Sequence, residues 1–196
     1  MAEDRTRSDR PTHLRGAAPA ALVVAALSAP VLVALAALAA PAWATTLLAW
    51  DLAELARRAD VVVIGTVTAR ATSEVERTLM TDTYVRVERV LRGEPTPAVT
   101  VRQLGGKLGR RVVDVPGDAV LEVGQRYVLF THAPGDGRTR YLMGMALGAL
   151  RLEGDEGVQQ VDVPLLSSTG ELTPPPGARR VPLAELERVV RSVGPR

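Results

Sequence analysis

Short runs of β-branched and apolar residues, separated by glycine- and proline-rich turns, recur along the chain from Val61 onward. Such runs favour buried strands, because branched side chains pack well on a pleated surface. We predict strands over 61–68, 80–92, 98–104, 111–115, 126–132, 141–145, 149–153 and 158–163. The acidic, glycine-flanked turn over 154–157 is typical of a hairpin between the last two. This spacing predicts a mainly β domain.

The run over 80–92 constrains the shape of that domain. Val85 and Val87 alternate with polar residues, but Val90 and Leu91 are adjacent, so the alternation slips by one residue. A β-bulge near Glu88 would restore inward pointing and would bend the strand. A bent strand and several glycine kinks favour a small OB-like antiparallel barrel, closed or partly open, over a flat sandwich.

Two amphipathic segments predict helices, which makes the fold α+β with β dominant. Asp51 is placed to cap a short helix from Leu52, and Glu54 can complete a capping box. A second helix is predicted from Pro182, with apolar residues on one face and charged residues on the other. We therefore expect a β-barrel domain over 45–166, a proline-rich loop over 167–180 and a C-terminal helix over 181–196.

The first 44 residues are organised like a secretory signal peptide. Arginines precede an uncharged run over 16–40, and Ala42 and Ala44 flank a cleavage site before Thr45. We expect export to the periplasm or out of the cell. The alternative is an inner-membrane anchor over 17–40, because ~20 apolar residues can span a bilayer. Two prolines and the high alanine content of the run argue against that anchor.

The composition after residue 44 excludes several classes of protein. Removing 44 of 196 residues leaves 152, enough for one domain with a hydrophobic core. The removed segment holds 4 of 24 basic and 3 of 22 acidic residues, which leaves 20 against 19. This near-neutral chain with few aromatics is not typical of nucleic-acid-binding proteins. Because it contains no cysteine, disulfides, thiolate metal sites and thiol nucleophiles are excluded.

Residues suited to catalysis are sparse. His132 is the one histidine after residue 44, and no G-x-S-x-G elbow is present. Asp136 and the acidic turn over 154–157 lack the D-x-D-x-D-G spacing of a calcium loop. The glycine-rich stretch over 105–109 lacks phosphate-loop spacing and is better explained as a hairpin turn. We expect no catalytic residue, no metal and no cofactor.

Three segments, 59–67, 84–93 and 124–130, together carry a family resemblance. They resemble uncharacterised exported bacterial proteins whose mature part begins with L-x-x-L-x-x-x-A-D-x-V-V-x-G-x-V. More distantly, they resemble the netrin-like module of tissue inhibitors of metalloproteinases. The resemblance implies an OB-type barrel packed with helices. Those inhibitors chelate zinc through an N-terminal cysteine, whereas this chain has none and its expected mature start is Thr45. No functional residue can therefore be transferred.

The function we expect is non-catalytic binding of a protein or cell-envelope ligand. By analogy with other OB-type barrels, the binding face would combine strands 86–92 and 98–103 with loops 72–78 and 105–110. Its exposed candidates are Arg86, Arg102, Gln103, Lys107 and Arg110. We expect no nucleic-acid partner, and membrane contact only through an uncleaved N-terminal segment. The alternatives are a netrin-like protease inhibitor without the zinc-chelating cysteine, and an enzyme whose site is not visible in sequence.

Overall fold

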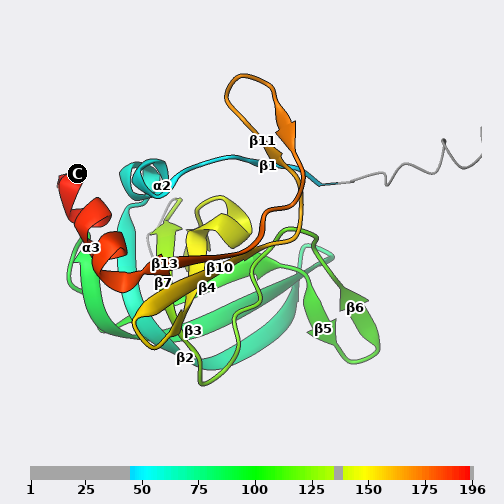
Figure 1. Ribbon diagram of the computed structural model, residues 1–196. Coiled ribbons are helices and arrows are strands. Elements are labelled where there is room, and N and C mark those ends of the chain that lie inside the picture. The colour runs from blue at the N-terminus through cyan, green and yellow to red at the C-terminus, as the bar shows by residue number, and fades with distance from the viewer. Residues whose placement is uncertain (1–44, 135–138, 195–196) are drawn as a thin grey trace, which may run out of the picture. The chain divides into compact units, whose positions relative to one another are not determined.

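The computed structural model describes residues 45–134 and 139–194 of the chain (Figure 1). The predicted signal segment, including Ala42 and Ala44, lies outside the described residues, as do 135–138 and the last two residues. Within the described part, no helix has the length and apolar character needed to cross a bilayer.

An eight-stranded mixed sheet, ordered β13-β10-β9-β7-β2-β3-β4-β8, dominates the described chain. Its strands are β2 (Val61–Val75), β3 (Thr78–Arg92), β4 (Ala98–Leu104), β7 (Arg126–His132), β8 (Thr139–Leu142), β9 (Ala149–Glu153), β10 (Glu156–Val161) and β13 (Gly177–Pro182). The remaining strands are β1 (Leu47–Leu48), β11 (Leu165–Leu166) and β12 (Leu172–Thr173) in a small sheet, and the hairpin of β5 (Gly106–Leu108) and β6 (Arg111–Val113). The prediction of a mainly β fold is confirmed.

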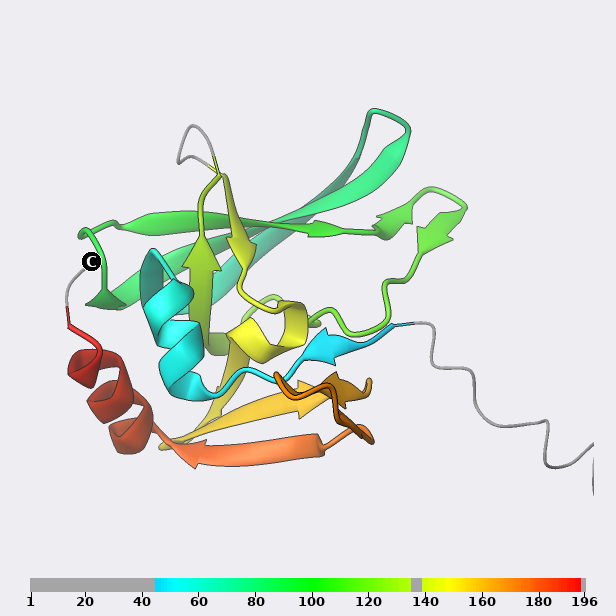
Figure 2. The same cartoon turned by 90° about the horizontal axis from the view of Figure 1, so that it is seen from above.

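Two α-helices, α2 (Leu52–Arg58) and α3 (Leu183–Ser192), lie side by side (Figures 1 and 2). Asp51 Oδ1 accepts a hydrogen bond from the backbone nitrogen of Glu54 at 2.7 Å, which confirms the predicted N-cap. The Glu54 carboxylate accepts hydrogen bonds from Arg57 and Arg58, one turn along the helix. These bonds, chiefly the one from Arg57, lower the pKa of Glu54.

The sheet is buried on both faces at its centre. Val62 and Ile64 of β2 join one core cluster with α2 and α3, while Val61 and Val63 join a second cluster on the opposite face. Side chains of a strand alternate between faces, so both clusters draw on the same strands. Burial on both faces explains why β2 and β7 read as continuous apolar runs rather than as alternating ones.

The β2–β3 pair carries the irregularities that bend it. Ile64 lies opposite Arg89 and Gly65 opposite Val87, so Glu88 is an extra residue on β3. The bulge predicted near Glu88 is therefore confirmed. Two further register shifts occur along the same pair, and extra residues of this kind increase strand twist and bending.

Several segments differ from the sequence-based expectation. The stretch over 105–109, expected to be a hairpin turn, contains β5, and the turn of the β5–β6 hairpin lies at Gly109 and Arg110. Residues 72–78 were expected to be a loop, but β2 runs to Val75 and β3 starts at Thr78, so only Glu76 and Arg77 form the turn. The strand expected over 141–145 ends at Leu142, and the chain continues into the 3-10 helix η1 (Met145–Gly148). Positive φ angles at Gly144 and Met145 break the extended conformation there.

The expected loop over 167–180 is also shorter than predicted. It contains β12, and from Gly177 onward it becomes β13, which pairs antiparallel with β10. The Arg179-Arg180 pair obscured this strand, because only Val181 in it is a buried apolar residue. Pairing with a distant strand, rather than local alternation, gives this segment its conformation.

Strand β8 contacts two strands that lie apart in the sheet order. It pairs in parallel with β4, through Thr100 opposite Thr139, and antiparallel with β7, through Thr131 opposite Leu142. The pairings from β7 through β2, β3, β4 and β8 therefore return to β7.

Candidate functional site

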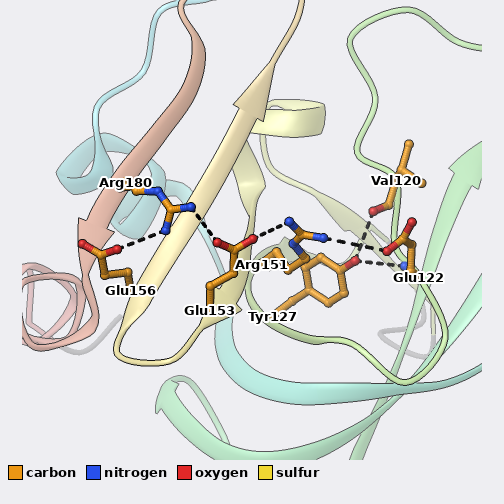
Figure 3. A network of polar contacts seen from close by, with 7 residues as sticks. All are labelled: Val120, Glu122, Tyr127, Arg151, Glu153, Glu156 and Arg180. Carbon is orange, nitrogen blue, oxygen red and sulfur yellow. Dashed lines mark hydrogen bonds and ion pairs between the residues drawn. The ribbon is translucent and has the colours of Figure 1, made fainter.

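The connection between β6 and β7, residues 114–125, crosses the sheet face opposite the helices. Leu121 anchors it, since this side chain is fully buried in the second core cluster. The hydroxyl of Tyr127 on β7 accepts from the backbone nitrogen of Glu122 at 2.9 Å and donates to the carbonyl oxygen of Val120 at 3.2 Å (Figure 3). One apolar and one aromatic side chain thus attach the loop to the sheet.

Three cavities surround this loop, and Asp118 borders all of them. The first, of about 270 Å³, lies between the loop and strands β9 and β10, where Tyr127 and Arg151 line it. The second, of about 300 Å³, lies between the loop, the end of β4 and the β5–β6 hairpin. The third, of about 280 Å³, is bordered by β4, β8 and Met145 of η1.

The carboxyl group of Asp118 is partly buried and hydrogen-bonded, and burial changes its pKa. Its Oδ1 accepts from the backbone nitrogen of Ala119 at 2.8 Å. Partial burial raises the pKa of Asp118, and hydrogen bonding from Gln103 only partly opposes that rise. Gln103 is 7% exposed and donates through Nε2 to the carbonyl oxygen of Ala119 at 2.8 Å, while its Oε1 has no partner among the described residues.

A ladder of charged side chains runs from β13 to the loop (Figure 3), and two of its members, Arg151 and Glu122, line the first cavity. Arg180 on β13 contacts Glu156 at 3.1 Å and Glu153 at 2.7 Å. Arg151 on β9 pairs with Glu153 and reaches Glu122 on the loop at 4.0 Å. The hydrogen bond from Arg180 holds the pKa of Glu153 below its usual range. Exposed pairs of this kind add little stability, so their effect is mainly on the charge pattern of the surface.

The structure brings three of the five predicted site residues to these cavities. Gln103 borders the second and third, Lys107 the second and Arg102 the third. The Arg102 guanidinium makes two 2.7 Å hydrogen bonds to the Asp82 carboxylate on the neighbouring strand. Arg86 and Arg110 are exposed and line none of the three cavities.

Sequence reasoning missed the residues of the loop itself. Asp118 stands in a Pro-Gly-Asp turn that indicates only the end of a strand, and Tyr127 stands in an apolar run typical of core. The available signal was the long connection over 114–125, because long loops without strands of their own are frequently functional. No pattern within the loop indicates that it lies across the sheet.

The polar groups here suit recognition by hydrogen bonding. They comprise a carboxyl group, a buried amide and a paired guanidinium beside apolar walls. Within residues 45–134 and 139–194, no group of three or more His, Cys, Asp or Glu side chains is placed to hold a metal ion.

No known family model matches the chain, and no curated protein matches it in sequence.

Proposed function

We propose that the chain is an exported, non-catalytic binding domain for a protein or cell-envelope ligand. The domain binds this ligand where residues 114–125 cross the sheet. The observation that carries this proposal is the convergence of three adjoining cavities on Asp118. Concave, largely apolar surfaces with a few placed polar groups are typical of ligand sites. Here Gln103 and Asp118 are the polar groups, and the loop supplies part of the apolar wall.

An OB-like barrel is part of this proposal. It is supported by the circuit of pairings among β2, β3, β4, β7 and β8, in which the β4–β8 contact is parallel and the others antiparallel. Barrels of this type commonly bind ligands on their second and third strands, which correspond to β3 and β4 here. Strand β4 carries Arg102 and Gln103.

The second cavity has the surface character expected of a contact with a partner. Its wall includes Leu104, Val112, Val113 and Val120, which are 53%, 66%, 43% and 71% exposed. Clustered exposed apolar side chains are uncommon on a surface that binds nothing. Arg70 and Lys107 also line this cavity, so the favoured ligand combines apolar surface with acceptor groups.

Site-specific photo-crosslinking in the native envelope tests the proposal. A crosslinking residue at Val120 should capture a defined partner, because this side chain lies exposed on the loop beside the cavities. The matched control is a crosslinking residue at Leu172, which is 57% exposed on β12. A Val120→Asp change should abolish binding of the captured partner without unfolding the domain. Identical products from both positions would contradict the proposal.

A further inference from the structure

The β2–β3 and β5–β6 hairpins project side by side from the body of the domain (Figures 1 and 2). An ion pair of 2.7 Å between Glu74 and Arg111 joins them. We call residues 74–78 and 107–113 the tip surface. It protrudes from the domain, and three of its residues, Lys107, Val112 and Val113, also line the second cavity at its base.

The β5–β6 hairpin is attached firmly at its base. Thr72 Oγ1 and Thr81 Oγ1 lie 2.9 Å apart, and the Thr81 hydroxyl donates to the carbonyl oxygen of Gly105 at 2.8 Å. Gly106 approaches so closely that a Cβ there would lie 2.1 Å from Thr81 Oγ1. These contacts set the position of the hairpin relative to β2 and β3, so its tip is presented in a defined place.

Apolar side chains are concentrated on this tip surface. Of the ten exposed large apolar residues in the described parts of the chain, four belong to it. They are Val75, Leu108, Val112 and Val113, at 37%, 40%, 66% and 43% exposure. A protruding apolar cluster of this kind marks a contact site for another apolar phase or partner.

Cationic side chains surround the apolar ones. Arg77, Lys107 and Arg110 are exposed, and none makes an ion pair or a side-chain hydrogen bond with another described residue. With Arg111 the tip surface holds four cations against two anions, Glu74 and Glu76, a net charge of +2. The tip surface is therefore complementary to a negatively charged surface that also accepts apolar side chains.

The turn that presents Arg77 has a strained backbone. Glu76 and Arg77 have φ angles of 48° and 67°, in the left-handed region that favours glycine and asparagine. Strain of this kind is more often found at functional positions than elsewhere. Here it places a charged pair at the end of the longest hairpin.

We propose that the tip surface docks on an anionic phospholipid bilayer. Leu108 and its apolar neighbours enter the headgroup region, while Arg77, Lys107 and Arg110 contact lipid phosphates. A bilayer fits because the apolar and cationic groups lie together at the ends of two projecting hairpins, where apolar side chains can enter a lipid surface while the cations reach its phosphates. The inference goes beyond the proposed function because it adds membrane contact by the folded domain itself, at the hairpin tips beyond the second cavity.

Tryptophan fluorescence of the full chain tests this docking locally. The Leu108→Trp variant is mixed with vesicles of phosphatidylcholine alone, or of equal parts phosphatidylcholine and phosphatidylglycerol. Its emission, corrected for the two native tryptophans, should shift to the blue and be quenched by brominated lipid only with the anionic vesicles. The Leu172→Trp variant is the matched control, because Leu172 is exposed away from the tip surface, and its emission should not change.

Removing two positive charges from the Leu108→Trp variant tests whether the cations contribute to membrane binding. Lys107→Gln and Arg110→Gln together should weaken binding to the anionic vesicles about 25-fold, or about fivefold for each cation. Unchanged circular dichroism would show that the fold is intact. Equal emission shifts with both vesicle types, or full binding by the charge variant, would overturn the proposal. A blue shift of the tryptophan emission with soluble polyglutamate but not with vesicles would also overturn the proposal. It would indicate that the tip surface binds an acidic polypeptide instead. Photo-crosslinking at Val120 in the otherwise unchanged protein tests the proposed function separately, so failure of membrane docking and failure of the proposed function can be told apart.

Discussion

The hydroxyl of Tyr127 lies 2.9 Å from the backbone nitrogen of Glu122, so a side chain in the middle of the sheet holds the loop that borders the cavities. The same hydroxyl also reaches the carbonyl oxygen of Val120. The phenol is protonated at neutral pH and able to donate, and burial raises its pKa further. The position of the loop therefore depends on one buried phenol and on the core residue Leu121.

Replacing Tyr127 with phenylalanine should loosen this loop. The Tyr127→Phe variant removes both hydrogen bonds and should cost about 1–2 kcal/mol in the free energy of unfolding. Denaturant titration measures that loss, and hydrogen exchange should show faster exchange at the Glu122 amide. Tyr84→Phe is the control, because Tyr84 is 42% exposed and its change should fall within about 0.5 kcal/mol. Equal effects of the two substitutions would contradict the role given to Tyr127.

The raised pKa of Asp118 predicts a pH dependence of stability. Below its ordinary value of 3.8, the carboxyl is protonated in both states and its burial costs no charge desolvation. As the pH rises through the interval up to the raised pKa, the unfolded chain ionises first, so the folded state is progressively destabilised. Asp118→Asn keeps the acceptor for Ala119 and removes this titration.

The variant should therefore be more stable than the wild type at neutral pH, and the difference should disappear in acid. Denaturant unfolding of both proteins at several pH values measures this difference in the free energy of unfolding. Asp155→Asn, in the exposed turn between β9 and β10, controls for loss of a surface charge. A stability difference for Asp118→Asn that does not change with pH would be the contrary result.

A methyl group at Gly106 should displace the β5–β6 hairpin. It would lie 2.1 Å from Thr81 Oγ1 and 2.7 Å from Thr72 Oγ1, and the φ of 122° also disfavours any side chain. We expect Gly106→Ala to cost about 2–4 kcal/mol. Gly109→Ala is the control, since its φ is also positive but nothing lies within 4 Å, and about 1 kcal/mol is expected. Thermal and denaturant unfolding compare the two, and equal costs would show that the threonine contacts are unimportant.

Relieving the strained turn should stabilise the domain. Glu76→Asn with Arg77→Gly supplies the residue types that two-residue hairpin turns with positive φ angles favour. The gain should be about 1 kcal/mol, because the greater freedom of glycine in the unfolded chain offsets part of the relief. Arg77→Ala removes the charge while retaining a side chain in the strained region, and should not stabilise. If the double variant unfolds at the wild-type denaturant concentration or below, the turn is not a source of strain.

Much of the secondary structure could be predicted because its signals are local. Strands over Ala98–Leu104, Arg126–His132 and Ala149–Glu153 have the predicted bounds, and the bulge at Glu88 follows from a slip in alternation. Strand β13 was missed because its pattern is weak and its pairing with β10 is distant in sequence. The strand predicted over 141–145 was wrong at its end, because the positive φ of Gly144 breaks the extended conformation. Local patterns thus succeed where an apolar or alternating run is bounded by turn residues.

The candidate site could be predicted only in part. Arg102, Gln103 and Lys107 border the cavities, but Gln103 was expected to be exposed and is buried, and Lys107 was expected in a turn and lies on β5. Asp118 was not predicted, because its position depends on how a loop without periodicity crosses the sheet.

The sequence alone determined most of the long strands, the Asp51 cap of α2, the bulge in β3 and the absence of cysteine, since each depends on neighbouring residues or on composition. The tertiary structure decided which distant residues meet. It placed Asp118 between three cavities and set the hairpin tips side by side through the Glu74–Arg111 pair. The physical reason is that side-chain period specifies a strand and its buried face, whereas register, loop path and long-range packing are settled only when the strands associate.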